Sequence, residues 1–271
     1  MTAPSASLLS PRVLLPFALV TLIWGSTWIV IKGQLGIVPP SWSVTYRFAV
    51  AAAAMFAFAV VRRERLTPGP RALAFAAMLG VAQFAFNFNF VYRAEQHITS
   101  GLVAVLFALL IVPNTLLGRL FLRTPIEARF LAGAGIAIGG VAMMILHEYR
   151  AAALDAHAVL IGTALTLSGV LSASISNVMQ GTHFARAQSM IVMIAWAMLF
   201  GALADGAFAW ITTGPPRIEG TPAYIGGVLY LGVIASAVTF PLYFGVIRAV
   251  RPGQAAWSSV LIPIIAMGFS T

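Results

Sequence analysis

The sequence predicts an all-α integral membrane protein, a polytopic helical bundle in which nine spanning helices make up most of a five-plus-five inverted repeat. Of the 271 residues, 60% are hydrophobic and only 8% are charged, whereas a soluble domain carries about 25% charged residues. A chain this apolar cannot cover its own surface with polar groups, so its solvent is lipid. The lengths of the apolar segments and the distribution of the basic residues support the same fold class.

Nine apolar segments approach the ~20 residues that a spanning helix requires. They cover residues 13–32, 42–61, 72–92, 100–121, 128–145, 158–179, 189–211, 223–247 and 255–270. Proline and glycine mark the breaks, for example at Pro39-Pro40 and at Gly214-Pro215-Pro216. The first segment is long enough to span, so we interpret it as a retained helix and not as a cleaved signal peptide. Because the links are short, sequential helices are expected to be antiparallel neighbours.

The basic residues predict the orientation of the chain. If the N-terminus is cytoplasmic, eleven of the 16 basic residues fall in cytoplasmic segments and four in outer segments, while Arg47 lies within the second span. Membrane proteins concentrate lysine and arginine in their cytoplasmic loops. The charge distribution therefore predicts a cytoplasmic N-terminus and also supports the number of spans.

A faint internal repeat links the third and eighth segments. Val91-Tyr92-Arg93-Ala94 ends one of them, and Val246-Ile247-Arg248-Ala249 ends the other. This pairing predicts a unit of five helices, and a unit with an odd number of spans must be inverted in the membrane, as in many secondary transporters. Chance similarity between apolar segments is the alternative. Two copies of the unit make ten helices, so we expect the tenth helix to be missing from this sequence.

The first segment contains Trp24-Gly25-Ser26-Thr27-Trp28 at membrane depth. Trp24 and Trp28 are four residues apart and share one face of a helix. Polar and small residues inside a span serve either helix packing or a transport pathway, and the motif alone leaves both interpretations open.

Other polar residues inside the spans are candidates for a binding site. Gln83 and Asn87 share a face of the third segment, and they would either line a cavity or lock helices together. Tyr243 follows Pro241, which is expected to kink the eighth segment. Trp257 fits either an interfacial aromatic belt or a cavity wall.

Three further features of the spans carry open alternatives. Arg47 would either extend to the membrane interface or attract an anionic group such as a substrate carboxylate. Asn89 is a weaker cavity candidate than Gln83 and Asn87. Serines recur every four residues at Ser168, Ser172 and Ser176, and this spacing favours close helix packing over a polar pathway.

The sequence lacks the residues and motifs that several kinds of chemistry require. There is no cysteine, no phosphate-binding loop and no HExxH or Gly-x-Ser-x-Gly motif, so we expect no enzyme, no cofactor and no metal site. The histidines show no metal-ligand spacing. Of the seven carboxylates, only Asp205 lies within a span, and proton-coupled exporters usually carry a carboxylate at membrane depth. We therefore expect facilitated transport, or coupling through a group not recognised here.

In their order along the chain, these motifs resemble the EamA family of the drug/metabolite transporter superfamily. The matching features are Leu22 to Trp28, Tyr46-Arg47-Phe48, Ile98 to Gly101, and Arg248 to Ala255 followed by Pro263. The resemblance implies two inverted five-helix halves around a central cavity, with the first in residues 1–150 and the second, lacking its last helix, in residues 151–271. It also implies a multi-pass protein of the bacterial inner membrane.

The resulting hypothesis is a secondary transporter, acting by alternating access, that exports small metabolites such as amino acids. Its partners would be the small-molecule substrate and the lipid bilayer, with no nucleic acid. The residues expected to bind substrate are Trp24, Gln83, Asn87, Tyr243, Arg47 and Trp257. A multidrug exporter of lipophilic compounds is the alternative within transport, and a non-transporting membrane scaffold or sensor is the alternative from another class.

Overall fold

The computed structural model describes residues 10–126, 128–150, 156–250 and 252–262. All regular secondary structure in these residues is helical, which confirms the predicted fold class. Seven helices in the described part are long and apolar enough to cross a membrane, namely Pro11–Gly33, Pro40–Val61, Pro70–Ala94, Ser100–Leu122, His157–Gly181, Met190–Thr213 and Pro222–Ala249.

The individual elements subdivide these spans. In chain order they are α1 (Pro11–Gly33), α2 (Pro40–Val61), α3 (Pro70–Gly80), the π-helix η1 (Val81–Phe86), α4 (Asn87–Ala94), α5 (Ser100–Phe107), the 3₁₀ turn η2 (Ala108–Leu110), α6 (Ile111–Leu122), α7 (Ala128–Arg150), α8 (Ala156–Gly181), α9 (His183–Arg186), α10 (Met190–Thr213), α11 (Pro222–Leu229), the π-helix η3 (Tyr230–Val238), α12 (Thr239–Ala249) and α13 (Pro252–Ala255).

Two of the nine predicted spans, the fifth and the ninth, are not among these seven helices. The fifth corresponds to α7, in which a shorter apolar stretch, Ala132–Leu146, is found. The ninth begins at α13 and is helical again from Trp257 to Ile262, while the rest of the predicted segment 255–270 lies outside the described residues.

Proline and hydroxyl residues define where helices begin. Pro11, Pro40, Pro70 and Pro222 each occupy the first turn of a helix, where the missing N–H costs nothing and the fixed φ angle suits the helix. Thr221 caps α11 by accepting a hydrogen bond from the backbone N–H of Tyr224 at 3.3 Å. The breaks predicted from proline-rich links are therefore helix starts.

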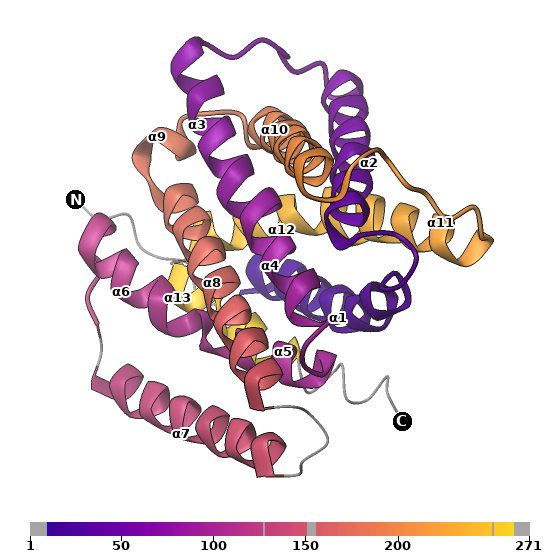
Figure 1. Cartoon of the computed structure of the whole chain (residues 1–271). Coiled ribbons are helices and arrows are strands. Elements are labelled where there is room, and N and C mark those ends of the chain that lie inside the picture. The colour runs from indigo at the N-terminus through magenta and orange to yellow at the C-terminus, as the bar shows by residue number, and fades with distance from the viewer. Residues whose placement is uncertain (1–9, 127, 151–155, 251, 263–271) are drawn as a thin grey trace.

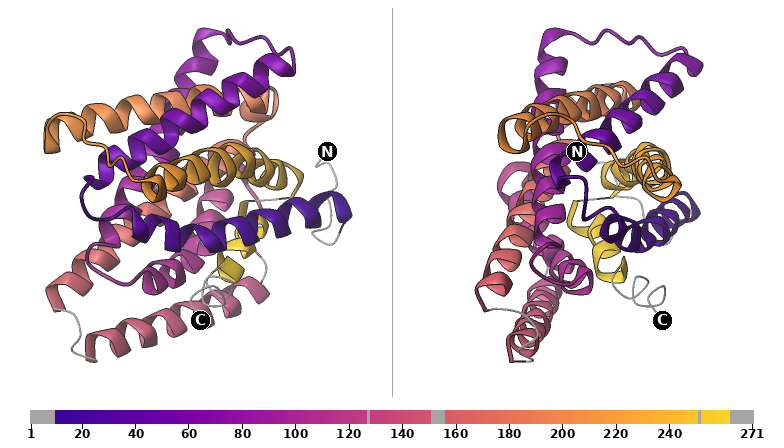
Figure 2. Two further views of the ribbon diagram at one scale, coloured as in Figure 1. Left: turned by 90° about the vertical axis from the view of Figure 1, so that its right-hand side faces the viewer. Right: turned by 45° about the vertical axis from the view of Figure 1, so that its right-hand side comes forward.

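The long helices lie side by side, with α1, α7, α10 and the α11–α12 span running in roughly a common direction (Figure 2). Helix α2 packs along α10, α4 along α8 and α1 along α12. Helix α7 lies at the edge of the bundle (Figure 1) and contacts α5, η2 and α8. The central helices α1, α4, α8 and α12 therefore surround the interior where a site can form.

Glycines allow the closest helix contacts. A Cβ atom added at Gly201 on α10 would lie 2.6 Å from the Cβ of Phe84 on η1 and 3.1 Å from the carbonyl oxygen of Gly80. At Gly232 on η3 an added Cβ would lie 2.9 Å from the carbonyl oxygen of Arg47. Small residues let helix backbones approach in a membrane, where packing rather than the hydrophobic effect drives association.

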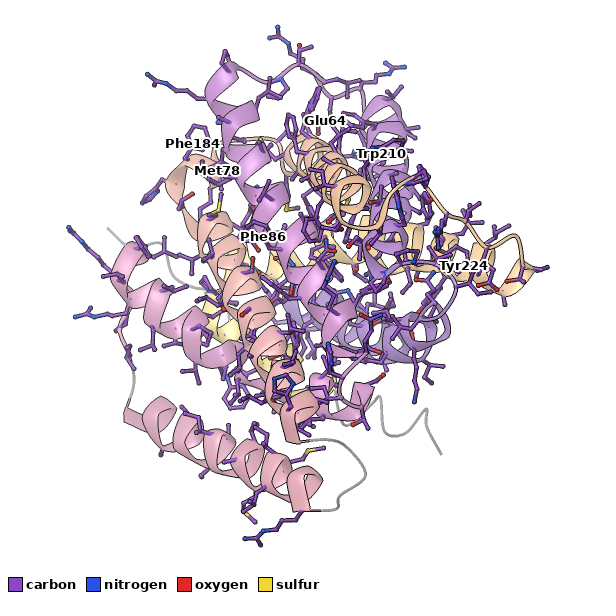
Figure 3. The ribbon with its side chains drawn as sticks, in the orientation of Figure 1. Glu64, Met78, Phe86, Phe184, Trp210 and Tyr224 are labelled. Carbon is purple, nitrogen blue, oxygen red and sulfur yellow. The ribbon has the colours of Figure 1, made fainter. Side chains whose placement is uncertain are left out.

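Large apolar side chains cover the outside of the bundle. Met78, Phe86 and Trp210, which are labelled in Figure 3, are each more than half exposed. In water such a surface would drive aggregation, whereas in lipid it is the expected one. Together with the seven apolar spans, this surface identifies a multi-pass membrane protein.

Candidate functional site

A cavity of about 90 Å³ lies between the first and second halves of the chain. Its walls come from α1, α2, η1, α4, α5, η2, α8, α12 and the helical residues after α13. Five of the six predicted binding residues line it, namely Trp24, Arg47, Gln83, Asn87 and Tyr243. The structure thus brings residues from both halves to one place, while their roles in binding stay predictions.

Trp24 forms an aromatic wall of the cavity. Its indole N–H donates to the carbonyl oxygen of Ala235 at 3.1 Å and to the hydroxyl of Thr239 at 3.0 Å. Its ring lies 4.9 Å from that of Tyr243 and 5.4 Å from that of Phe240. Because its N–H already has partners on the second half, Trp24 offers the cavity its ring face and holds α1 against η3 and α12.

Gln83 projects from the π-helix η1 and is fixed by α8. Its side-chain carbonyl accepts a hydrogen bond from Ser176, and Ser172 donates to the backbone carbonyl of Ala82 at 2.7 Å. A π-helix at membrane depth needs partners for its irregular backbone, and Ser172 provides one of them. Two of the three regularly spaced serines therefore pack α8 against η1, as the sequence pattern favours.

Arg47 is fully enclosed by the bundle. It is 1% exposed, its Nε donates to the hydroxyl of Ser236 at 3.0 Å, and its guanidinium carbon lies 4.3 Å above the ring of Phe88. The interpretation in which Arg47 extends to the membrane interface is therefore wrong. The reason is that η3 and α4 supply a hydrogen bond and an aromatic face inside the bundle.

Three polar atoms at the cavity have no hydrogen-bond partner among the described residues. They are Nη1 of Arg47, Oδ1 of Asn87 and Nε1 of Trp28, and all three residues line the cavity. A buried donor or acceptor left without a partner costs about 1–3 kcal/mol, and a charged one costs more. Residues of the cavity lining therefore carry two donors and one acceptor whose hydrogen-bonding capacity is unused by the described part of the chain.

Tyr243, which lies on α12, belongs to a network of polar side chains. Its hydroxyl accepts from Asn177 at 3.4 Å, Asn177 also donates to Asn114 at 3.4 Å, and Asn114 donates to the carbonyl oxygen of Pro252 at 3.1 Å. This network joins α6, α8, α12 and α13 at the cavity wall, since Tyr243 and Asn177 both line the cavity.

Trp257 does not line the cavity, in contrast to the prediction. Its side chain is 47% exposed, whereas the next two residues, Ser258 and Ser259, line the cavity and are buried. Consecutive helical residues point about 100° apart, so the serines and the tryptophan occupy different faces. The exposed position fits the alternative of a membrane-facing aromatic residue.

Asn89 belongs to a second polar cluster outside the cavity lining. Its Nδ2 donates to Asp205 on α10, and its Oδ1 accepts from Ser41 on α2 at 2.7 Å. Arg93 extends the cluster by donating to Ser41 at 3.3 Å. Asp205 is completely buried, and its Oδ2 has no partner among the described residues. The cluster ties α2, α4 and α10 together.

Each end of the bundle has a hydrogen bond between the end of one helix and the end of another. Tyr92 on α4 donates to Gln34, just after α1, at 3.2 Å. Arg248 on α12 donates to Gln180 on α8 at 2.9 Å. The start of α2 contacts both α4 and α11, because Ser41 bonds Asn89 at 2.7 Å and Ser43 bonds Tyr224 at 2.9 Å. The α11–α12 span therefore begins at the end of the bundle where α4 finishes, and Arg248 lies near the other end of that span. The two contacts therefore lie at opposite ends.

Glu95 lies just beyond α4, outside the spanning segments. Its Oε2 accepts from the hydroxyl of Ser100 at 2.6 Å. Burial raises the pKa of Glu95 to about 7, although the Ser100 hydroxyl and the positive charge of Lys32 act in the opposite direction. A carboxyl at this end of the bundle therefore titrates near neutral pH.

The prediction missed several aromatic residues of the cavity. Trp28, Phe88 and Phe107 line it, and the rings of Trp28 and Phe107 meet edge-on at 6.1 Å. For Trp28 a signal existed, because it shares a helical face with Trp24. Phe88 and Phe107 lie among many similar apolar residues, and nothing in the sequence distinguishes them.

Comparison with known proteins agrees with this architecture. The EamA-like transporter family matches the chain twice, at residues 12–146 and 160–271. The chain is 30% identical to the uncharacterized inner membrane transporter YedA of Escherichia coli, covering 92% of this chain and 79% of that protein. It is 27% identical to protein PagO of Salmonella typhimurium, covering 93% of this chain and 81% of that protein. It is 23% identical to a probable amino-acid metabolite efflux pump of Escherichia coli, covering 92% of this chain and 82% of that protein.

A solved crystal structure has the same fold. It superposes with a TM-score of 0.68 at 19% sequence identity, covering 94% of this chain and 92% of that one. The two profile matches, the membrane-spanning helices and the shared fold lead to one conclusion. The chain belongs to the EamA-like transporter family and is a multi-pass membrane protein of that family.

Proposed function

We propose that the protein is a secondary transporter that exports small amino acids or related metabolites by alternating access through the central cavity. The observation that carries the proposal is the cavity itself, which lies between the two halves and is lined by residues of both. Contacts at opposite ends of the bundle, Tyr92 with Gln34 and Arg248 with Gln180, are suited to act as two gates. A binding site between repeats with a gate on each side is the arrangement that alternating access requires.

The size of the cavity supports a small substrate. Its volume of about 90 Å³ is well below the roughly 300–1,000 Å³ of pockets that take drug-sized ligands. Relatives named as probable amino-acid metabolite efflux pumps, at 23% identity, support the same class. The charge distribution supports a cytoplasmic N-terminus, and the inner membrane relatives support that location.

One observation favours a multidrug exporter as a second candidate. The cavity has aromatic walls, with Trp24, Trp28, Phe88, Phe107, Phe240 and Tyr243 among its lining residues, and such walls suit lipophilic compounds. Against this candidate stand the small volume and the buried guanidinium of Arg47, whose positive charge repels a cationic compound.

Efflux from proteoliposomes tests the proposal. Vesicles containing the purified protein would be loaded with a pool of labelled amino acids, and efflux would be followed at increasing concentration. We expect saturable flux for at least one amino acid, and a reduced flux in Gln83→Ala and Asn87→Ala. Ser168→Ala is the matched control, because Ser168 is an exposed residue of α8 that bonds only its own helix.

The possible results separate the candidates. If amino acids do not move but lipophilic compounds do, the amino-acid proposal is wrong and the multidrug candidate stands. If neither class moves, the scaffold or sensor alternative is favoured.

A further inference from the structure

The cavity contains a cation whose charge has no counterpart in the lining. Arg47 is the one charged residue among the described residues that line it. The acids Asp205 and Glu95 do not line the cavity, and Asp205 accepts from Asn89 while Glu95 accepts from Ser100. Burying a charge costs free energy unless the charge is paired and hydrogen-bonded. An anionic group of a ligand would supply the missing partner.

Arg47 cannot leave the cavity to find that partner in solvent. Its Nε is bonded to Ser236 at 3.0 Å, and its guanidinium carbon lies 4.3 Å from the centre of the Phe88 ring and 5.3 Å from that of Phe48. These contacts hold the guanidinium inside the bundle, and Nη1 is left as an unpartnered donor. An arginine fork held in this way suits carboxylate recognition.

The remaining unpartnered atoms match the rest of an amino-acid head group. Nε1 of Trp28 is a second donor, and Oδ1 of Asn87 is an acceptor. A carboxylate has two oxygens that accept from N–H donors, and an ammonium group has only donors. The cavity is small enough, at about 90 Å³, for one head group to reach groups on several of its walls.

We propose that Arg47 and Trp28 bind the carboxylate of the substrate and that Asn87 accepts a hydrogen bond from its ammonium group. The inference rests on the proposed transport function and adds the chemical class of substrate. Zwitterionic amino acids are accepted, with their side chains against the aromatic walls, and cations that lack a carboxylate are rejected. Trp24 takes no part in the polar recognition because its N–H is already bonded to the second half.

Isothermal titration of the purified protein in lipid nanodiscs tests this assignment without requiring transport. The probes are L-alanine and L-leucine, each with its methyl ester and its decarboxylated amine. We expect at least one of the two amino acids to bind, and its ester and amine to bind at least about 10-fold more weakly, since a charge-assisted hydrogen bond is lost. Equal binding of acid, ester and amine would overturn the proposal with the unmodified protein alone.

Substitutions then locate the interaction. Arg47→Gln is expected to weaken binding of the amino acid by about 10- to 100-fold and to remove the preference over the ester. Trp28→Phe keeps an aromatic side chain, although a smaller one, removes the donor and is expected to cause a smaller loss. The matched control is Arg93→Gln, because Arg93 also lies over a ring, that of Phe208 at 5.1 Å, but outside the cavity lining.

The outcomes distinguish this inference from the proposed function. Selective binding without flux would contradict transport and leave the head-group assignment standing. Flux of amino acids with binding that Arg47→Gln and Trp28→Phe leave unchanged would overturn the assignment and leave transport standing. If Arg47→Gln does not fold, Trp28→Phe and the probe series still decide the question.

Discussion

Replacing Tyr92 by phenylalanine is expected to favour opening of the cavity at the end of the bundle where α4 finishes. The substitution removes the hydroxyl that donates to Gln34 at 3.2 Å and leaves the ring in place. The corresponding change at the opposite end is Arg248→Gln, which removes the guanidinium that donates to Gln180 at 2.9 Å. We expect the two variants to open opposite ends.

The two effects differ in size because one bond is neutral and the other is charged. A neutral hydrogen bond contributes a net ~0.5–1.5 kcal/mol, so losing that of Tyr92 shifts the equilibrium between closed and open ends by about 2- to 13-fold. A bond from a charged donor contributes ~1.5–3 kcal/mol, so losing that of Arg248 shifts it by about 13- to 160-fold. The shorter distance at Arg248 is consistent with this order.

Cysteine labelling measures the opening, because the natural chain contains no cysteine. Ser259→Cys places a single small reporter at a buried position of the cavity wall. Its reaction with a membrane-impermeant maleimide would be compared in vesicles of the two orientations. Tyr46→Phe is the control, because the Tyr46 hydroxyl donates to the carbonyl oxygen of Arg217 at 2.9 Å in an exposed contact.

The predicted result is faster labelling from one face for Tyr92→Phe and from the other face for Arg248→Gln, with little change for Tyr46→Phe. Faster labelling from the same face in both variants would refute the reasoning, because the two contacts would then not act as separate gates. An effect of Tyr46→Phe as large as that of Tyr92→Phe would refute it as well.

Three other predictions concern single positions. Gly201→Ala places a methyl group 2.6 Å from the Cβ of Phe84 and is expected to destabilise the fold by about 1–3 kcal/mol; an unchanged unfolding temperature in detergent would contradict the close contact. The pKa of Glu95 is raised to about 7 in the folded protein, so protonation of Glu95 stabilises the fold fully below the unfolded pKa, near 4.5, and this stabilisation is lost as the pH rises through 7. Glu95→Gln should remove this part of the pH dependence of the unfolding temperature, and an unaltered pH profile would contradict the prediction. Asp205→Asn keeps an oxygen to accept from Asn89 and leaves the cavity lining unchanged, so it should not alter the pH dependence of flux; loss of a steep pH dependence in this variant would show that transport is proton-coupled.

The sequence was sufficient to predict the fold and part of the site, for identifiable physical reasons. Spans follow from the length and apolarity of local segments, and the proline-rich breaks coincide with helix starts such as Pro40 and Pro222. Gln83 and Asn87 share one cavity because residues four apart share a helical face. These are local properties, which a single sequence contains.

Features that depend on long-range packing could not be predicted in the same way. Arg47 stays inside the bundle because Ser236, 189 residues away, accepts from its Nε. Asn89 finds Asp205 across 116 positions of the sequence. The direction of Trp257 depends on which face of its helix meets the cavity, and that face is set by contacts with helices far away in the sequence. The π-helices η1 and η3 likewise depend on neighbours such as Ser172 that satisfy their backbone.

Counterflow in proteoliposomes tests the central claim, a single cavity that opens alternately to the two sides, most directly. Vesicles loaded with an unlabelled amino acid would be diluted into a trace of the same amino acid in labelled form. An alternating-access carrier is expected to accumulate the label transiently above its equilibrium level, and Asn87→Leu should reduce that accumulation while Ser168→Ala should not. Entry of label that never exceeds equilibrium, for any amino acid that the protein moves, would contradict an alternating cavity and indicate an open pathway instead.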